Sequence, residues 1–324
     1  MKLLDCAVAS AALMVGALAF AADDAEYPSK PLRLIVPQSP GSATDALTRV
    51  FAPKLAEVLG QAVVIDNRAG AGGVLGADLA AKSPPDGYTV LIGATAWVTV
   101  APHLYKKIPY DPIADFAPVS LFALGQHLLV VAASSGIRTS ADLIAQMKAR
   151  PNQLNMASAG VGSSSQLSGT LFMRLANVSA VHVPYKGAGQ SVVAVIAGEA
   201  DWTFTPLAGP LPHVRSGKLR ALAVGGAERS PILPEVPTVA ETVLPEFVTS
   251  SWFGVMLPKG ASTAIVGKLN AAVVKAVQSA DLRDQLLTQG AEPKTNSPAE
   301  FAQFVRMDLE TTRKTAQLAG VVPE

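Results

Sequence analysis

The sequence predicts an α/β protein with a parallel-rich sheet in each of two domains. Its 324 residues suffice for two domains of ordinary size, and 49% hydrophobic against 16% charged residues provide material for two cores. Predicted strands alternate with helices along the chain, a pattern typical of parallel sheets covered by helices. Two similar strand–turn–helix–strand units, at residues 34–67 and 154–184, lie more than a hundred residues apart, which indicates one unit in each domain.

The first unit has a turn of small and polar residues directly before its helix. A buried strand is predicted at residues 32–36, and the turn Pro40–Asp45 follows it. Thr44 or Asp45 is expected to cap the helix, which ends at Gly60. Glycine lets the backbone approach a ligand closely, and the first N–H groups of a helix have no internal partner. Such a helix start attracts anions.

The second unit repeats this arrangement with glycines and serines before a helix that extends to Ala176. Ligands of parallel sheets bind outside the carboxyl ends of the strands, where both turns are predicted to lie. Two such turns that face each other across a cleft would bind a small carboxylate or a similar anion. The residues that we expect to bind the ligand are Gly41, Ser42, Ala43, Thr44, Asp45, Thr95, Ser158, Gly162, Ser163, Ser164, Tyr185 and Asp201.

Two of these candidates are acidic and need a separate interpretation. Asp45 would repel a carboxylate, so we expect it to orient its loop or to bind an amine or hydroxyl group of the ligand. Asp201 is interpreted as a buried cap or as an acceptor for a ligand hydroxyl, and a general base is the less favoured alternative. Trp202, which follows it, lies either in the core or along the cleft. Trp97 and Trp252 are expected in the core.

The sequence gives little support for catalysis, for a metal or for a cofactor. The serines at 163–165 lack a surrounding G-x-S-x-G motif, and the histidines at 103, 127, 182 and 213 have no metal-ligand spacing. The glycines at 70–76 do not complete a G-x-G-x-x-G motif, so we interpret them as a turn and as close helix packing. A net charge of +1 argues against a nucleic-acid partner.

The first residues predict export. An apolar run from Ala7 to Ala22 ends in Ala19-Phe20-Ala21, which fits a signal-peptide cleavage site, so we assign residues 1–21 to a signal peptide and expect a periplasmic protein. An uncleaved anchor is the alternative, because Asp5 is atypical of such a segment. The mature chain is then not expected to span a membrane. It would also lack a thiol, since the single cysteine is Cys6.

The domain boundaries follow from two apolar segments that are expected to cross between the domains. One is residues 116–133, interrupted at Gly125-Gln126-His127, and the other is residues 251–258. We assign residues 22–123 and 248–324 to domain 1, and residues 124–247 to domain 2. Further helices are predicted to begin at serines, the last of which forms a capping box with Glu300. These serines are Ser140, Ser191, Ser262 and Ser297.

Several short motifs occur together in a specific order. They are Pro40–Asp45, Asp66–Gly73, Pro85–Tyr88, Leu104–Val119, His182–Gly187, Pro234–Thr238 and Ser251–Gly254. In this order the chain, from Tyr27 to Gly320, resembles the Bug-type substrate-binding proteins of tripartite tricarboxylate transport systems. The resemblance implies a type II-like periplasmic binding protein of the Venus flytrap kind, with a hinge of two crossing strands. It also implies that loops at Pro40–Asp45 and Gly160–Gln166 grip a carboxylate largely through backbone groups and waters.

Three departures from the family pattern bear on the ligand or the scaffold. Ser42 replaces a second glycine, Gln166 replaces a common histidine, and Asp66-Asn67-Arg68-Ala69 replaces a Glu-Asn-Arg-Pro motif. The function predicted is a monomeric receptor that delivers a small organic acid to membrane transporter subunits or to a sensor kinase. The alternative is an exported hydrolase acting on a small acid. A base beside the serines would favour the hydrolase, and two facing helix starts without one would favour the receptor.

Overall fold

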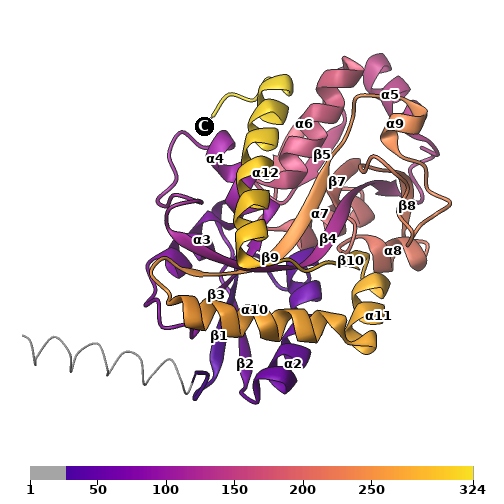
Figure 1. The fold of residues 1–324 in the computed structure, drawn as a ribbon. Coiled ribbons are helices and arrows are strands. Elements are labelled where there is room, and N and C mark those ends of the chain that lie inside the picture. Colours follow the sequence, from indigo (N-terminus) through magenta and orange to yellow (C-terminus); the bar gives the residue numbers. More distant parts are fainter. Residues whose placement is uncertain (1–26, 324) are drawn as a thin grey trace, which may run out of the picture.

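Residues 27–323 of the chain are described by a computed structural model, so the predicted signal peptide lies outside the described residues. The chain forms two sheets that share one long strand, β4 (Phe116–Ala132), as Figure 1 shows. The first part of β4 pairs with strands of the first sheet, and the part from His127 onward pairs with strands of the second. The crossing predicted around Gly125–His127 lies where β4 changes its partner from β9 to β7, and the strand itself runs through these residues without interruption.

The first sheet has the strand order β2-β1-β3-β9-β4, and β10 adds to β4. Its strands β1, β2 and β3 are parallel, whereas β9 runs antiparallel to both β3 and β4. The strands are β1 (Leu32–Val36), β2 (Val63–Asn67), β3 (Thr89–Ala94), β9 (Ser250–Pro258) and β10 (Ala291–Pro293). Its helices are α2 (Ala43–Leu59), α3 (Val74–Ala81), α4 (Ala101–Leu104), α10 (Thr263–Gln278), α11 (Ala280–Thr288) and α12 (Pro298–Leu318), with short helical turns η1 (Ala71–Gly73) and η2 (Ala96–Val100).

The second sheet is built around the later part of β4, which pairs with β7 and β8. Strand β5 lies parallel to both β6 and β7. The strands are β5 (Asn155–Ser158), β6 (Val181–Pro184), β7 (Trp202–Pro206) and β8 (Leu219–Val224). The helices are α5 (Ser140–Ala149), α6 (Ser164–Ala176), α7 (Ala188–Ala197), α8 (Leu211–Arg215) and α9 (Val239–Thr242). The predicted α/β fold is confirmed, and each sheet is mixed, with parallel pairs among β1, β2 and β3 and among β5, β6 and β7, and antiparallel pairs along β4 and β9.

Three predicted helix starts need correction. Ser42, and neither Thr44 nor Asp45, caps α2, since its hydroxyl accepts a hydrogen bond from the Asp45 N–H. Thr139 caps α5 one residue before the predicted Ser140, in a capping box with Asp142. Helix α7 begins three residues before Ser191, at Ala188. The starts at Ser262 and Ser297 are confirmed, the latter with its capping box.

Each sheet has its own aromatic core. In the first, Phe51 stacks on Phe122 with ring centroids 4.6 Å apart. In the second, Phe204 stacks on Phe247 at 5.1 Å, and Phe172 contacts both rings. Trp202 is fully buried in this second core and does not line the cleft. Burying such large side chains is a main source of stability in both halves.

The C-terminal helix α12 joins the two halves. Its Phe301 and Val305 pack in the first core, and Ala316 packs in the second, so the helix runs from one half toward the other (Figure 1). Strand β4 and the segment before β9 also pass between the sheets. The domain boundaries at 123/124 and 247/248 stay a prediction. Within residues 27–323, no helix has the length and apolar character needed to span a membrane.

Candidate functional site

The carboxyl ends of strands from both sheets enclose a small cavity of about 30 Å3. It is lined by the starts of α2, α6 and α7, by the ends of β3 and β7, and by β9. Six of the twelve predicted ligand-binding residues meet here. They are Ser42, Ala43, Thr44, Thr95, Ser163 and Ser164.

The start of α2 contains backbone N–H groups that have no hydrogen-bond partner in the helix itself. Gly41 has a positive φ of 80°, which glycine adopts without strain, and this turns the chain into the helix. The Ser42 hydroxyl accepts a hydrogen bond from the Asp45 N–H at 3.2 Å. The N–H groups of Ala43 and Thr44 precede the first intrahelical hydrogen bond, so they have no partner in their own helix.

Asp45 holds this turn in place from within the first helical turn. Its carboxylate accepts hydrogen bonds from the Gly41 N–H at 2.9 Å, from Arg49 at 2.8 Å and from Asn67 at 2.9 Å. Burial raises the pKa of Asp45, but the hydrogen bonds from Arg49, Gly41 and Asn67 together outweigh it and leave the pKa below its ordinary value. Asp45 therefore orients the loop, which is one of the two roles expected for it.

The start of α6 is organised in the same way. Ser163 caps the helix and donates to the Gly160 carbonyl at 2.6 Å, while Ser165 accepts from the Ala159 N–H at 2.8 Å. The Gln166 side chain accepts from the Gly162 N–H at 2.8 Å, at the same four-residue spacing as Asp45 and Gly41. The hydroxyls of Ser163 and Ser165 and the Gln166 side chain therefore hold the loop in place by hydrogen bonds within the chain.

Ser164 is the first residue of α6 and lies at the centre of the arrangement. Its hydroxyl makes no hydrogen bond to another residue in the described part of the chain, and its side chain lines the cavity. The backbone N–H groups of Ser164 and Ser165 precede the first intrahelical hydrogen bond. The start of α6 therefore faces the start of α2 across the cavity, and it too has N–H groups without a partner in their helix.

A third helix start, that of α7, was missed by the sequence reasoning. Gly187 precedes the helix, Ala188 lines the cavity, and the Gln190 side chain accepts from the Lys186 N–H at 3.2 Å. This repeats the spacing found at the other two starts. The Gly187-to-Gln190 pattern was a usable signal, but the helix was predicted to begin at Ser191, which is fully buried and bonds to the Ala188 carbonyl.

Three further polar side chains at the cavity were also missed. Gln38 Oε1, Trp97 Nε1 and Ser251 Oγ are buried and have no hydrogen-bond partner within residues 27–323. A buried polar atom without a partner costs about 1–3 kcal/mol. A ligand or water with donors and acceptors of its own would remove that cost. These isolated residues have no sequence motif, so only the fold brings them together.

The electrostatics of the cavity come from the backbone. Among the described residues that line it, none is an Asp, Glu, Lys or Arg. Aligned helix dipoles place a partial positive charge at each helix start. Three starts at one small cavity can therefore bind a negative group through N–H donors, without a cationic side chain.

Gly41 and Tyr185 lie near the central cavity but do not line it. They border an adjacent depression together with His213 and residues of α7. Gly162, which has a positive φ of 77°, lies against the Tyr105 ring of the other half. The Tyr105 hydroxyl donates to the Val161 carbonyl at 2.6 Å, so loops from the two halves touch beside the cavity.

Ser158 and Asp201 serve the scaffold. The Ser158 hydroxyl is fully buried and lies 2.6 Å from His182 Nε2, so this serine–histidine pair presents no nucleophile to the cavity. The Asp201 carboxylate accepts from the Asn155 N–H at 2.7 Å, at the amino end of β5. The cavity lies at the carboxyl end, so Asp201 does not line it, and the structure gives no support to the predicted contact between Asp201 and the ligand. Within residues 27–323, no group of three or more His, Cys, Asp or Glu side chains could hold a metal ion.

Comparison with known proteins identifies the family. Residues 47–320 match the family described as "Tripartite tricarboxylate transporter family receptor". The chain belongs to this family. It is thus a receptor of the tripartite tricarboxylate type and not an enzyme, and the resemblance inferred from the sequence is confirmed.

Relatives of known sequence cover most of this receptor. BugT of Bordetella pertussis is 40% identical over 92% of this chain and 90% of its own length. A UPF0065 protein from the tcbD-tcbE intergenic region of Pseudomonas sp. (strain P51) is 39% identical over 89% of this chain and 86% of its own length.

Solved structures confirm the periplasmic binding protein fold of the receptor. Rpa4515 of R. palustris, solved with adipate, has a TM-score of 0.90 and 36% identity, covering 92% of this chain and 100% of that one. MatC of Rhodopseudomonas palustris, with bound malate, has a TM-score of 0.85 and 32% identity, covering 89% and 99%. The periplasmic binding protein BugD has a TM-score of 0.88 at 27% identity and covers 92% and 100%. The receptor is accordingly a periplasmic protein.

Proposed function

We propose that this receptor binds a small organic acid and holds one carboxylate between the helix starts of α2 and α6, with α7 completing the site. The observation that carries the proposal is the meeting of three helix starts at one cavity without a charged side chain. The carboxylate would accept hydrogen bonds from the N–H groups of Ala43, Thr44, Ser164 and Ser165. The structurally similar proteins solved with adipate and with malate support an acid as the ligand.

The halves on either side of the cavity would close on the acid. A ligand shifts such an equilibrium only if it contacts the closed form better than the open one. The N–H donors of α2 belong to one half and those of α6 to the other. One carboxylate can accept hydrogen bonds from both helices only when the halves are close together, so it would bind the closed form better than the open form. The contact between Tyr105 and Val161 would then form on closure.

The loaded receptor would deliver its acid to the membrane subunits of a tripartite tricarboxylate transporter, or to a sensor. We further propose that residues 1–21 are removed on export, that the mature protein works as a monomer, and that its domains divide at the boundaries predicted above. The hydrolase alternative loses support, because the family is one of receptors, His182 contacts Ser158 away from the cavity, and His127 makes no hydrogen bond to Ser164 although both line one cavity.

Calorimetric titration of the parent protein tests the proposal. We expect adipate or malate to bind and 1,6-hexanediol, the uncharged counterpart of adipate, not to bind, because only a carboxylate gains from the helix dipoles. The protein should be purified without refolding and analysed first by native mass spectrometry, so that a carried-over acid is detected and included in the titration. Equal affinity for acid and diol, or no binding of any acid, would contradict the proposal.

A further inference from the structure

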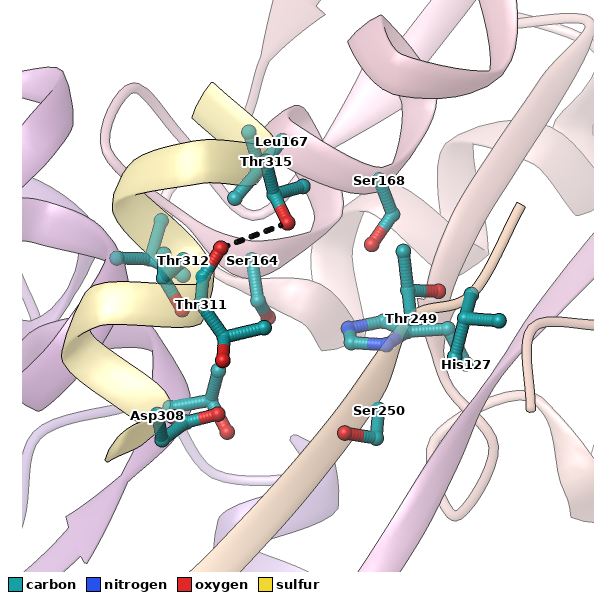
Figure 2. A pocket seen from close by; sticks show the side chains of 13 residues that line it. His127, Ser164, Leu167, Ser168, Thr249, Ser250, Asp308, Thr311, Thr312 and Thr315 are labelled. Carbon is teal, nitrogen blue, oxygen red and sulfur yellow. Dashed lines mark hydrogen bonds between the residues drawn. The ribbon is translucent and has the colours of Figure 1, made fainter. Parts of the chain in front are cut away.

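A second cavity, of about 100 Å3 and shown in Figure 2, adjoins the candidate site where the chain crosses between the two sheets. We call it the hinge cavity. Its walls come from β4, the segment leading into β9, α6 and α12, so both halves contribute to it. The polar residues of its lining on which the inference depends are Thr95, His127, Ser164, Thr249 and Asp308.

His127 presents an unused hydrogen-bonding ring to this cavity. Its side chain is 1% exposed, and neither ring nitrogen has a hydrogen-bond partner among the described residues. Figure 2 shows the imidazole pointing into the cavity toward Ser164. Burial lowers the pKa of His127 to about 3, so the ring is neutral near pH 7. A neutral imidazole donates through one nitrogen and accepts through the other.

Asp308 on α12 supplies an acceptor on another wall of the cavity. Its Oδ2 accepts from the Thr99 hydroxyl at 2.6 Å and from the Trp252 indole N–H at 2.8 Å, which fixes the carboxyl group. Both of these hydrogen bonds use the same oxygen, so Oδ1 is left for another donor. The Thr249 hydroxyl is also buried without a hydrogen-bond partner among the described residues. No Lys or Arg belongs to the described lining of this cavity.

The hinge cavity and the candidate site are neighbours. Thr95 and Ser164 line both of them. The candidate site, at about 30 Å3, has room for about two water molecules or one carboxylate group. The remainder of a longer acid must therefore lie elsewhere. The hinge cavity borders the carboxylate position directly and has buried polar groups without partners.

We propose that the hinge cavity binds the end of the acid remote from its anchored carboxylate, and that this end is an uncharged hydrogen-bonding group such as a hydroxyl. The proposal rests on the proposed function, since it presumes an acid anchored at the helix starts. A hydroxyl would donate to Asp308 Oδ1 and accept from His127 or Thr249, which matches the donors and acceptors present. A second carboxylate would meet the Asp308 carboxyl group without a cation to balance it.

The test compares acids that differ only at their remote end. The probes are hexanoate, 6-hydroxyhexanoate and adipate, and their four-carbon counterparts butyrate, 4-hydroxybutyrate and succinate. Each acid is titrated into four proteins, which are the parent, His127→Leu, His127→Gln and Thr249→Val. The six-carbon and the four-carbon acids form two series, and the comparison uses the series that the parent binds more tightly. Within it, the affinity of the parent for the hydroxy acid should exceed its affinity for the methyl-ended acid and for the diacid by about tenfold or more. His127→Leu should remove that preference and leave the affinity for the methyl-ended acid within about threefold of the parent.

His127→Gln should retain most of the preference, because the amide donates and accepts as the imidazole does. Thr249→Val is nearly isosteric and removes only an unpartnered hydroxyl, so it should fold normally and weaken the hydroxy acid alone. It keeps the test valid if His127→Leu does not fold. Acid binding with no hydroxyl preference in the parent, or a preference that survives both His127→Leu and Thr249→Val, overturns this inference and leaves the proposed function intact. Failure of every acid to bind overturns the proposed function instead.

Discussion

Ser164→Asp is expected to fold as well as the parent protein and to lose at least about a hundredfold in affinity for the organic acid. Ser164 is the first residue of α6, and a carboxylate at that position interacts favourably with the helix dipole, by about 0.3–1 kcal/mol. The same carboxylate would occupy the N–H groups meant for the ligand. It would also repel the ligand at about 4 Å, which costs several kcal/mol at the intermediate dielectric constant of a protein cleft.

Thr263→Asp is the matched control. Thr263 is likewise the first residue of a serine-capped helix, α10, and it is exposed and borders none of the cavities described above. Ser191 does not serve as this control, since it is buried in the first turns of α7, whose start lines the site. Melting curves should show both aspartate variants within a few degrees of the parent. Calorimetry should show acid binding lost in Ser164→Asp alone. Unchanged binding by Ser164→Asp would rule out an anion held at the start of α6.

Gly162→Ala is expected to weaken acid binding about five- to a hundredfold by opposing closure. A Cβ atom at this position would lie 2.0 Å from Tyr105 Cε2, on the other half of the protein. Tyr105 cannot move away without losing its 2.6 Å hydrogen bond to Val161. Overpacking of this kind costs about 1–3 kcal/mol, and here the cost falls on the closed form. Apparent affinity falls with the population of the form that binds.

Gly136→Ala separates this effect from backbone strain. Gly136 has a φ of 78° against 77° for Gly162, and a Cβ atom there would meet nothing within 4 Å. An alanine is strained at such a positive φ, so both variants should have a free energy of unfolding that is lower by a similar amount, about 1 kcal/mol. Small-angle scattering should show that added acid reduces the radius of gyration of the parent and of Gly136→Ala but not of Gly162→Ala. Normal contraction and affinity in Gly162→Ala would argue against closure through this contact.

Local patterns were enough to predict most of the architecture. Buried runs such as Leu32–Val36 and stop signals such as Gly60 gave strand and helix positions that the structure confirms. The errors arise where tertiary context overrides a local signal. The crossing predicted around Gly125-Gln126-His127 is not such an error, since β4 changes its partner from β9 to β7 there and neighbouring strands satisfy its backbone. Ser140 was chosen as a cap although Thr139 forms the better capping box.

The site was predictable only where glycine and hydroxyl residues mark a helix start. That signal predicted the starts of α2 and α6. Residues 42–44 and 163–165, at these two starts, line the cavity. It missed α7, where Ala188 has no polar side chain to reveal its position. Gln38, Ser251 and His127 lie on strands or loops far apart in sequence, and nothing local shows that they turn toward a shared space. Asp201 directly precedes β7, at the end of the sheet away from the cavity, and nothing in the local sequence shows that its carboxylate bonds to the Asn155 N–H there.

A crystal structure of the receptor with its bound acid tests the central claim most directly. The acid would be the one carried through purification or the tightest binder in the titrations. We predict that one carboxylate lies between the two halves, with its oxygens about 2.7–3.2 Å from backbone N–H groups of both α2, at Ala43 or Thr44, and α6, at Ser164 or Ser165. A carboxylate that contacts only one half, or that is held by a Lys or Arg side chain outside this cavity, would contradict the account.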